Sequence, residues 1–145
     1  MSTTGTPMLV PQPPGIPLPV PSARSHPFWE GCREGRLVLP RCTHCGARAL
    51  RAFAACSQCH QRTLGWEPSG GRGSLYSWTV VWRPPHQSFV VPYAPAVIAL
   101  DEGWWFLSAV VGCAPGDLHE GMALEVTFQA ASESVALPYF HPLGG

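Results

Sequence analysis

The sequence predicts a mainly β protein in which a short helix and a cysteine-rich ribbon precede a small five-stranded barrel. Two Cys-x-x-Cys pairs, separated by ten residues, stand in the first half of the 145-residue chain. From Ser74 onward, hydrophobic and polar residues alternate with the period of two that is typical of β-strands. Only residues 25–34 combine helix start and stop signals with apolar side chains at helical spacing.

The first 24 residues predict a proline-rich extended arm. Seven of the first 21 residues are proline and none is charged. Proline fixes φ and donates no backbone hydrogen bond, which excludes a helix or a central strand here. We expect a polyproline-II-like arm that is solvated and poorly ordered in the isolated chain, with docking along a partner as the alternative.

Residues 25–66 predict a docking helix followed by a metal-binding ribbon. Ser25 is a suitable N-cap, and Phe28 and Trp29 share one side of the helix. Because so short a helix is unstable alone, these aromatic side chains are expected to dock on the body of the protein or on a partner subunit. Two short strands are expected to lead into the two cysteine pairs, at residues 36–41 and 49–54.

Residues 67–145 predict the barrel domain. Turn formers at residues 67–73 mark its boundary with the ribbon. Five strands follow, with at most one helical turn between the third and the fourth, at residues 74–82, 96–100, 104–111, 122–129 and 134–139. The last is expected to be an edge strand that Pro138 ends. This layout is that of an OB-fold barrel.

Four cysteines predict one structural metal site: Cys42, Cys45, Cys56 and Cys59. Each pair can curl into a turn that aims two thiolates at one point, and Gly46 suits the first turn because glycine tolerates positive φ. Together the turns make a tetrahedral set of four sulfurs, which zinc prefers. The closed shell leaves no position for water, so we expect one structural Zn²⁺ and no catalytic metal.

Other roles for these cysteines have less support. A thioredoxin-like redox pair needs a βαβ setting, two disulfides need an oxidising compartment, and the sequence indicates neither. Iron in a rubredoxin-type site is the geometric alternative to zinc. His44 and His60 stand beside the ligands, but four thiolates already fill the shell.

The charge layout indicates an anionic partner for the first half of the chain. From Arg33 to Arg83, eight arginines stand against two glutamates, a net charge of +6, whereas residues 84–145 hold six acidic and no basic side chains. Phosphates of nucleic acid or of coenzyme A are candidates, and mutual neutralisation of the two halves is the alternative. Charged residues are only 12% of the chain, which indicates apolar surface for a partner.

A candidate ligand-binding set lies at the first barrel strand. Trp78 and Trp82 are expected on one strand face, with Arg72 and Arg83 near its ends, an arrangement that suits stacking on a base or an adenine. The alternative is that both indoles fill the core or an interface, and the acidic second half argues against a groove that is basic throughout.

No catalytic residue is predicted, because the sequence contains no triad, phosphate-binding glycine loop or dinucleotide fingerprint. Cys113 with His119 as its base is a weak candidate nucleophile. With neither a signal peptide nor an apolar run of about 20 residues, the protein is expected to be cytoplasmic and to need no membrane.

Seven short motifs occur in a fixed order: Phe28-Trp-Glu-Gly31, Gly35-Arg-Leu37, Arg41-Cys-Thr-His-Cys-Gly46, Cys56-Ser-Gln-Cys59, Gly73-Ser-Leu-Tyr-Ser-Trp-Thr-Val80, Pro92-Tyr93 and Gly121-Met-Ala-Leu-Glu-Val-Thr-Phe128. In this order they resemble a family first catalogued as a domain of unknown function, which joins a rubredoxin-like zinc ribbon to an OB-fold. The resemblance covers residues 28–142. The ordered set is more specific than the cysteine pattern, which many ribbons share.

This resemblance implies an accessory role. Members of the family are usually encoded with thiolase-like enzymes and act as their non-catalytic partner subunits, in complexes that handle acyl-CoA, including steroid side-chain thioesters. The family's four zinc ligands fall on the four cysteines, and it lends no catalytic residue. The leading hypothesis is therefore a zinc-binding accessory subunit that docks on a thiolase-like aldolase or acyltransferase. The alternatives are a single-stranded nucleic-acid-binding OB-fold protein and an enzyme that uses Cys113.

Overall fold

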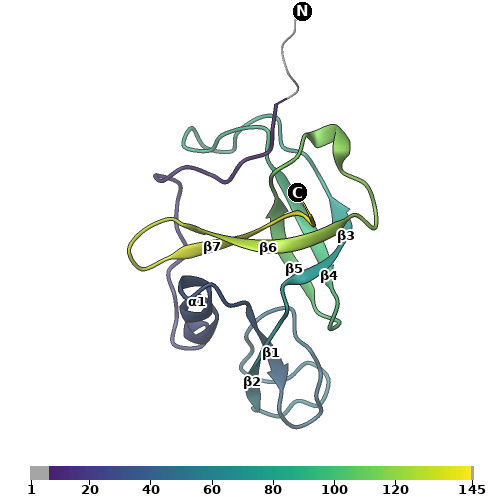
Figure 1. The fold of residues 1–145 in the computed structure, drawn as a ribbon. Helices are drawn as coiled ribbons and strands as arrows, with labels where there is room; N and C mark the ends of the chain where they lie inside the picture. Colours follow the sequence, from purple (N-terminus) through teal and green to yellow (C-terminus); the bar gives the residue numbers. More distant parts are fainter. Residues whose placement is uncertain (1–6, 145) are drawn as a thin grey trace, which may run out of the picture.

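A two-stranded ribbon stands at one end of a closed five-stranded barrel, with one α-helix beside both (Figure 1). The computed structural model describes residues 7–144. Its mainly β architecture, with a cysteine ribbon before a barrel, confirms the predicted fold class. Among the described residues, no helix has the length and hydrophobicity needed to cross a membrane.

Helix α1 (His26–Arg33) lies where the sequence predicts it. Ser25 occupies the N-cap position, but its hydroxyl pairs with Ser22 and makes no side-chain cap. Phe28 packs on Phe106 of the barrel, with ring centroids 5.9 Å apart. A Cβ on Gly31 would lie 2.7 Å from the Arg36 carbonyl oxygen, so glycine permits the chain to return closely past the helix. The helix is thereby fixed to the chain's own body.

The ribbon pairs β1 (Val38–Cys42) with β2 (Leu64–Pro68) in antiparallel register. The strand predicted at residues 49–54 is wrong, because that segment is a loop. It meets β1 through a hydrogen bond from the Ala49 N–H to the Pro40 carbonyl oxygen, next to the isolated Arg41–Arg48 bridge. The strand that pairs with β1 is β2, which could not be predicted because it contains a glycine and ends in turn-forming residues. Gly65 is needed there, since a Cβ would come within 2.5 Å of the Thr43 methyl group.

Five strands close into the barrel, with a single 3₁₀ turn, η1 (Pro115–Asp117), after the third. They are β3 (Arg72–Trp78), β4 (Ala94–Leu100), β5 (Trp105–Val110), β6 (Ala123–Ala130) and β7 (Ala136–Pro142). Their order is β3-β4-β5-β7-β6, and β6 returns to β3. All pairs are antiparallel except β5–β7. This is the pairing of an OB-fold, as predicted.

Each of the five barrel strands begins or ends one or more residues from its predicted bounds, and the differences in β3 and β7 have structural causes. β3 ends at Trp78 instead of residue 82, and a β-bulge at Tyr76 shifts its register against β4. β7 is not an edge strand, since it pairs with β6 and β5 and continues through Pro138 to Pro142. Its contact with β5 is one bridge, at Val110 and Phe140, so the missing N–H of Pro138 removes no bond from a long ladder.

Ribbon and barrel share one hydrophobic core. Leu37 and Leu39 lie in the same cluster as Ile98 and Phe140 of the barrel. The Trp104 indole N–H donates to the Pro40 carbonyl oxygen of β1 at 2.8 Å. Beside it, the Glu102 carboxylate accepts from the Ser69 hydroxyl and the Gly70 N–H, both at 2.8 Å, and so holds the turn between β2 and β3. The domain boundary at residue 67 stays a prediction.

The proline-rich arm is docked on the barrel around Leu9. This side chain is 1% exposed, its N–H donates to the Cys113 carbonyl oxygen, and its carbonyl accepts from Gly112, both at 2.8 Å. Gln12 exchanges two side-chain hydrogen bonds with the backbone of Val90. The expectation of a solvated arm is therefore wrong here, and residues 1–6 lie outside the described part of the chain.

Candidate metal centre

The first Cys-x-x-Cys pair forms a tight turn at the end of β1. The Cys42 N–H donates to the Ala47 carbonyl oxygen at 2.9 Å, and the Gly46 N–H returns to the Cys42 carbonyl oxygen at 3.0 Å. Closing the turn in this way requires positive φ at Gly46, which is +78°. Glycine adopts this conformation without steric cost, as the sequence predicts.

The second pair repeats the same turn with a different residue at its strained position. The Cys56 N–H donates to Gln61, and the His60 N–H returns to Cys56, both at 2.8 Å. His60 has φ +65°, and it is the one non-glycine residue with positive φ among those described. A β-carbon costs energy in the left-handed region, so the backbone here is held by the ribbon.

The two turns bring four sulfur atoms together. Sγ of Cys42 lies 3.6 Å from Sγ of Cys59, and Sγ of Cys45 lies 3.7 Å from Sγ of Cys56. All four lie within 4.8 Å of one another. Tetrahedral sulfurs around a zinc ion would be about 3.8 Å apart, given Zn–S bonds near 2.3 Å. The cysteines are free thiols too far apart for disulfides, so this cluster can hold a metal ion.

The cluster's electrostatics favour thiolates only in part. The Thr63 hydroxyl, 3.0 Å from Sγ of Cys42, lowers the pKa of Cys42 to about 5, assisted by the Cys45 N–H. The N–H groups of Cys59 and Gln58 lower the pKa of Cys56. The Gln61 N–H also lowers the pKa of Cys59, but burial and the neighbouring thiols outweigh it and raise that pKa to about 12. Four adjacent thiolates therefore need a cation to neutralise them, which fits a metal site.

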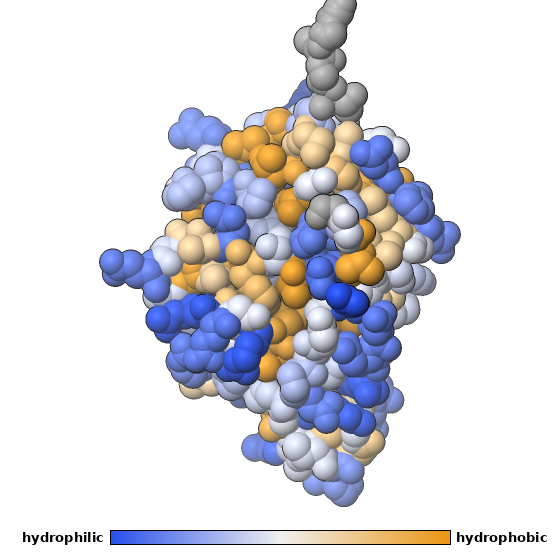
Figure 2. Space-filling model, viewed as in Figure 1, coloured by the Kyte–Doolittle hydropathy of each residue, from blue (hydrophilic) through white to orange (hydrophobic). Residues whose placement is uncertain are grey.

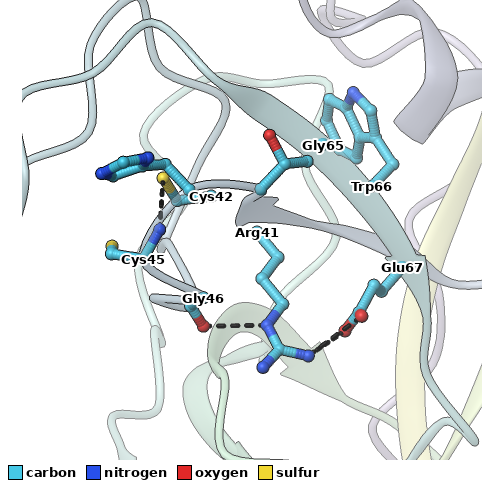
Figure 3. A pocket seen from close by; sticks show the side chains of 9 residues that line it. Arg41, Cys42, Cys45, Gly46, Gly65, Trp66 and Glu67 are labelled. Atoms are coloured by element: carbon cyan, nitrogen blue, oxygen red, sulfur yellow. Dashed lines mark hydrogen bonds and ion pairs between the residues drawn. The ribbon is translucent and has the colours of Figure 1, made fainter.

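Arg41 fixes the first turn to the ribbon and was not anticipated from the sequence. Its Nε donates to the Gly46 carbonyl oxygen at 2.8 Å, and its Nη1 contacts both carboxylate oxygens of Glu67 at 2.8 and 2.9 Å (Figure 3). The guanidinium thus ties the metal-binding turn to β2. Its place immediately before Cys42 is a signal that could have pointed to it. The histidines His44 and His60 stand outside the sulfur cluster.

The four candidate ligand residues do not converge in this structure. Arg72 pairs with Glu125 at 3.1 Å, at the start of β3, whereas Trp78 lies at its end, about 20 Å along the strand at 3.3 Å per residue. Trp78 is half-buried against the core, and Trp82 and Arg83 are exposed beyond the strand. Ligand binding by these residues stays a prediction.

An exposed aromatic face on the barrel was missed from the sequence. We define the barrel face as Tyr76, Val97, Trp105 and Leu107. The rings of Tyr76 and Trp105 lie 4.6 Å apart, and Leu107 pairs with Val97 across β4 and β5. Trp105 is 53% and Leu107 64% exposed. Tyr76 lies on this outer face beside the buried Leu75, and the bulge breaks the alternation after it, so that Trp78 turns toward the core.

The two aromatic residues predicted to dock on a partner, Phe28 and Trp29, lie on α1 and contact each other and the pocket beside the barrel. Phe28 meets Trp29 edge-on, with centroids 4.8 Å apart, and both line a pocket between α1, the ribbon and Phe106. Their contact with a partner stays a prediction.

Cys113 is 7% exposed, and burial, followed by the charge of Asp117, raises the pKa of its thiol. A buried thiol of raised pKa is a poor nucleophile, because the reactive form is the thiolate.

Comparisons with known proteins agree with this architecture. The family profile described as the C-terminal OB-fold domain of ChsH2 matches residues 66–129. The solved Ltp2-ChsH2(DUF35) aldolase contains a chain that is 29% identical and superimposes with a TM-score of 0.78, covering 86% of this chain and 98% of that one. A DUF35 protein of unknown function from Sulfolobus solfataricus is 13% identical with a TM-score of 0.57, over 83% of this chain and 85% of that one, and shows the fold alone.

Two curated relatives match in sequence. A probable enoyl-CoA hydratase alpha subunit from Thermomonospora curvata is 32% identical over 120 residues, 82% of this chain, which spans 38% of that protein's length. A DUF35 domain-containing scaffold protein from Methanocaldococcus jannaschii is 31% identical over 99 residues, 67% of this chain and 70% of the relative. With the cysteine ribbon and the OB-fold barrel, these matches show that the chain belongs to the DUF35 family.

Proposed function

We propose that this chain is a non-catalytic, zinc-binding accessory subunit that docks on a thiolase-like aldolase or acyltransferase acting on acyl-CoA thioesters. One observation carries the proposal: the chain covers 98% of a chain of the Ltp2-ChsH2(DUF35) aldolase with a TM-score of 0.78. The scaffold name of the M. jannaschii relative supports the same role. Steroid side-chain thioesters are the candidate substrates that the family resemblance adds, and the cytoplasm is the expected location.

The barrel face supports the docking role. Trp105 and Leu107 each leave more than half of their side-chain surface exposed, beside Tyr76 and Val97. Exposed patches of this kind mark interaction sites, and aromatic residues are enriched in protein interfaces. We assign this face to the enzyme subunit, because burying it would remove three exposed apolar side chains, those of Tyr76, Trp105 and Leu107, from water.

Zinc is the metal we assign to the ribbon. Four thiolates in a tetrahedral arrangement suit Zn²⁺, and the residues that would hold it are Cys42, Cys45, Cys56 and Cys59. A four-sulfur shell offers no open position, so the ion would stabilise the ribbon and supply no chemistry. Metal analysis of the purified protein should find one zinc per chain. Iron, or a Cys45→Ser variant that keeps a full zinc content, would contradict the assignment.

Co-purification tests the docking role directly. Tagged protein from its native host should retain a thiolase-like protein in stoichiometric amount, identified by mass spectrometry. Trp105→Ser and Leu107→Ser should weaken this association, whereas Trp82→Ser, an equally exposed tryptophan outside the barrel face, should leave it unchanged. A chain that remains alone on a sizing column when mixed with the candidate enzyme would refute the proposal.

A further inference from the structure

A basic pocket lies along the ribbon loop that joins the two Cys-x-x-Cys pairs, and it shares no residue with the barrel face. We define the arginine pocket as the surface hollow of about 710 Å³ that Arg24, Arg48 and Arg51 line, together with the loop up to Ser57. This loop joins the two Cys-x-x-Cys pairs, so the ribbon's own turns hold both of its ends. Figure 2 shows that hydrophilic side chains dominate the ribbon end of the visible face, whereas hydrophobic ones gather over the barrel.

The three arginines of this pocket form no ion pair among the described residues. Other arginines of the chain do make ion pairs: Arg33 with Glu30, Arg36 with Glu34, Arg41 with Glu67 and Arg72 with Glu125. Within residues 7–144, no carboxylate lies within ion-pair distance of the three pocket guanidiniums. An acidic residue of the second half, Glu125, thus pairs with Arg72, but in the part of the chain that the structure describes no such ion pair forms with the arginines of the pocket.

Arg48 is held in place by contacts that leave its charge available. Its guanidinium lies over the Trp104 ring, 5.1 Å from the centroid, so packing fixes its orientation. The nearest acidic influence is Glu102, whose two oxygens already accept hydrogen bonds from Ser69 and Gly70. A cation that is oriented without being neutralised is suited to binding an anion from solution.

Among the described residues, the loop backbone leaves N–H donors without a protein acceptor. In the described structure, no N–H group from residue 50 to residue 55 donates a hydrogen bond to a protein acceptor, although Ala49 before them and Cys56 after them do. Four of the lining side chains are small, at Ala49, Ala52, Ala54 and Ala55, and they stand beside the larger Leu50 and Phe53. Small side chains allow a ligand oxygen to approach the backbone, and unpaired N–H groups need a partner in water or in a ligand.

We propose that the arginine pocket binds the phosphate groups of a nucleotide. Arginine presents planar pairs of N–H donors that match phosphate oxygens, and the hollow shape fits a small polyanion better than the flat surface of an acidic protein. The inference rests on the proposed function for one point only, the identity of the nucleotide. If the chain serves an acyl-CoA enzyme, the ligand is the phosphorylated nucleotide end of coenzyme A, bound while the thioester end reaches the partner subunit.

Calorimetric titration of the metal-loaded full chain with ADP and with coenzyme A tests this pocket. Binding should be absent for adenosine and should weaken as salt is raised, because it depends on phosphate charge. Arg24→Ala and Arg51→Ala should each reduce the affinity by about tenfold, the usual loss for a hydrogen bond to a charged group. Arg62→Ala removes an equal charge from an exposed site outside the pocket and should change the affinity little.

The outcomes separate this inference from the accessory role. Equal losses in the pocket and control variants, or no binding of either nucleotide at millimolar concentration, overturn the pocket, even if a thiolase-like subunit co-purifies. Tight binding of a single-stranded oligonucleotide without binding of ADP also overturns it. Nucleotide binding that Arg24→Ala and Arg51→Ala each weaken about tenfold supports the pocket, even if no enzyme subunit is captured. Unchanged thermal unfolding of both variants establishes that the fold is intact.

Discussion

Truncating Leu9 tests whether the N-terminal arm is part of the folded unit. Leu9→Ala removes three carbon atoms from a side chain that is 1% exposed. At about 0.8 kcal/mol for each buried methylene, the lost transfer free energy is about 2 kcal/mol. A cavity that the barrel fills only in part raises the total to about 3–4 kcal/mol, within the range of buried Leu→Ala substitutions. This is a large share of a domain's stability of about 5–15 kcal/mol.

Urea unfolding of the metal-loaded chain, followed by circular dichroism, measures this loss. With a slope of about 1–3 kcal/mol per molar urea, the midpoint should fall by 1 M or more. The control is Val20→Ala in the same arm, where the side chain is 89% exposed and the change should stay within about 0.5 kcal/mol. If Leu9→Ala behaves like this control, the arm does not contribute to the core in solution and its docking is refuted.

Three further predictions concern the ribbon and its junction with the barrel. His60→Gly should raise the free energy of unfolding by about 0.5–1 kcal/mol, because glycine adopts positive φ without strain, whereas Gly46→Ala should lower it by about 1 kcal/mol. If urea unfolding shows the same sign of change for both variants, the two turns do not share the strained position. Trp104→Phe should cost about 1–2 kcal/mol, since the indole no longer donates to Pro40; an unchanged unfolding midpoint would show that this bond does not join ribbon to barrel. Although burial raises it, the Gly70 N–H and the Ser69 hydroxyl lower the pKa of Glu102 below its ordinary 4.5. The unfolded chain therefore binds this proton more readily, so the stability that Glu102 contributes is present above pH 4.5 and is lost as the pH falls through its folded pKa. Glu102→Gln should flatten that acid limb of the stability profile, and a profile as steep as that of the parent would exclude Glu102 as its source.

The barrel could be predicted because its signals are local. Apolar and polar residues alternate in the sequence of β6, the apolar run at residues 96–100 lies in β4, and the turn at Asp101–Gly103 joins β4 to β5 as expected. The cysteine spacing likewise fixes the metal centre, because a tight turn needs only residues that are neighbours in sequence. Features of this kind depend on the chemistry of a few adjacent residues and are readable without knowledge of the tertiary structure.

Features that depend on distant contacts were missed. Strand β2 contains Gly65 and ends at Pro68, so it resembles a turn, yet its pairing with β1 makes a strand of it. Pro138 resembles the end of a strand, but β7 tolerates it because β5 pairs with β7 at one bridge only. Leu9 is one apolar residue among prolines, and only the barrel surface that it covers reveals its role. In each case tertiary contacts override the local preference of the chain.

The position of Trp104 gives the molecule an internal optical probe. Of its six tryptophans this one alone is buried, at 2% exposure. Its indole touches β1 two residues before Cys42, and the guanidinium of Arg48 lies over its ring. Metal binding to the cysteine cluster and anion binding to the arginine pocket, as proposed, would therefore both alter the surroundings of this buried indole. Its fluorescence would report the two events without any label, from a residue that binds neither ligand.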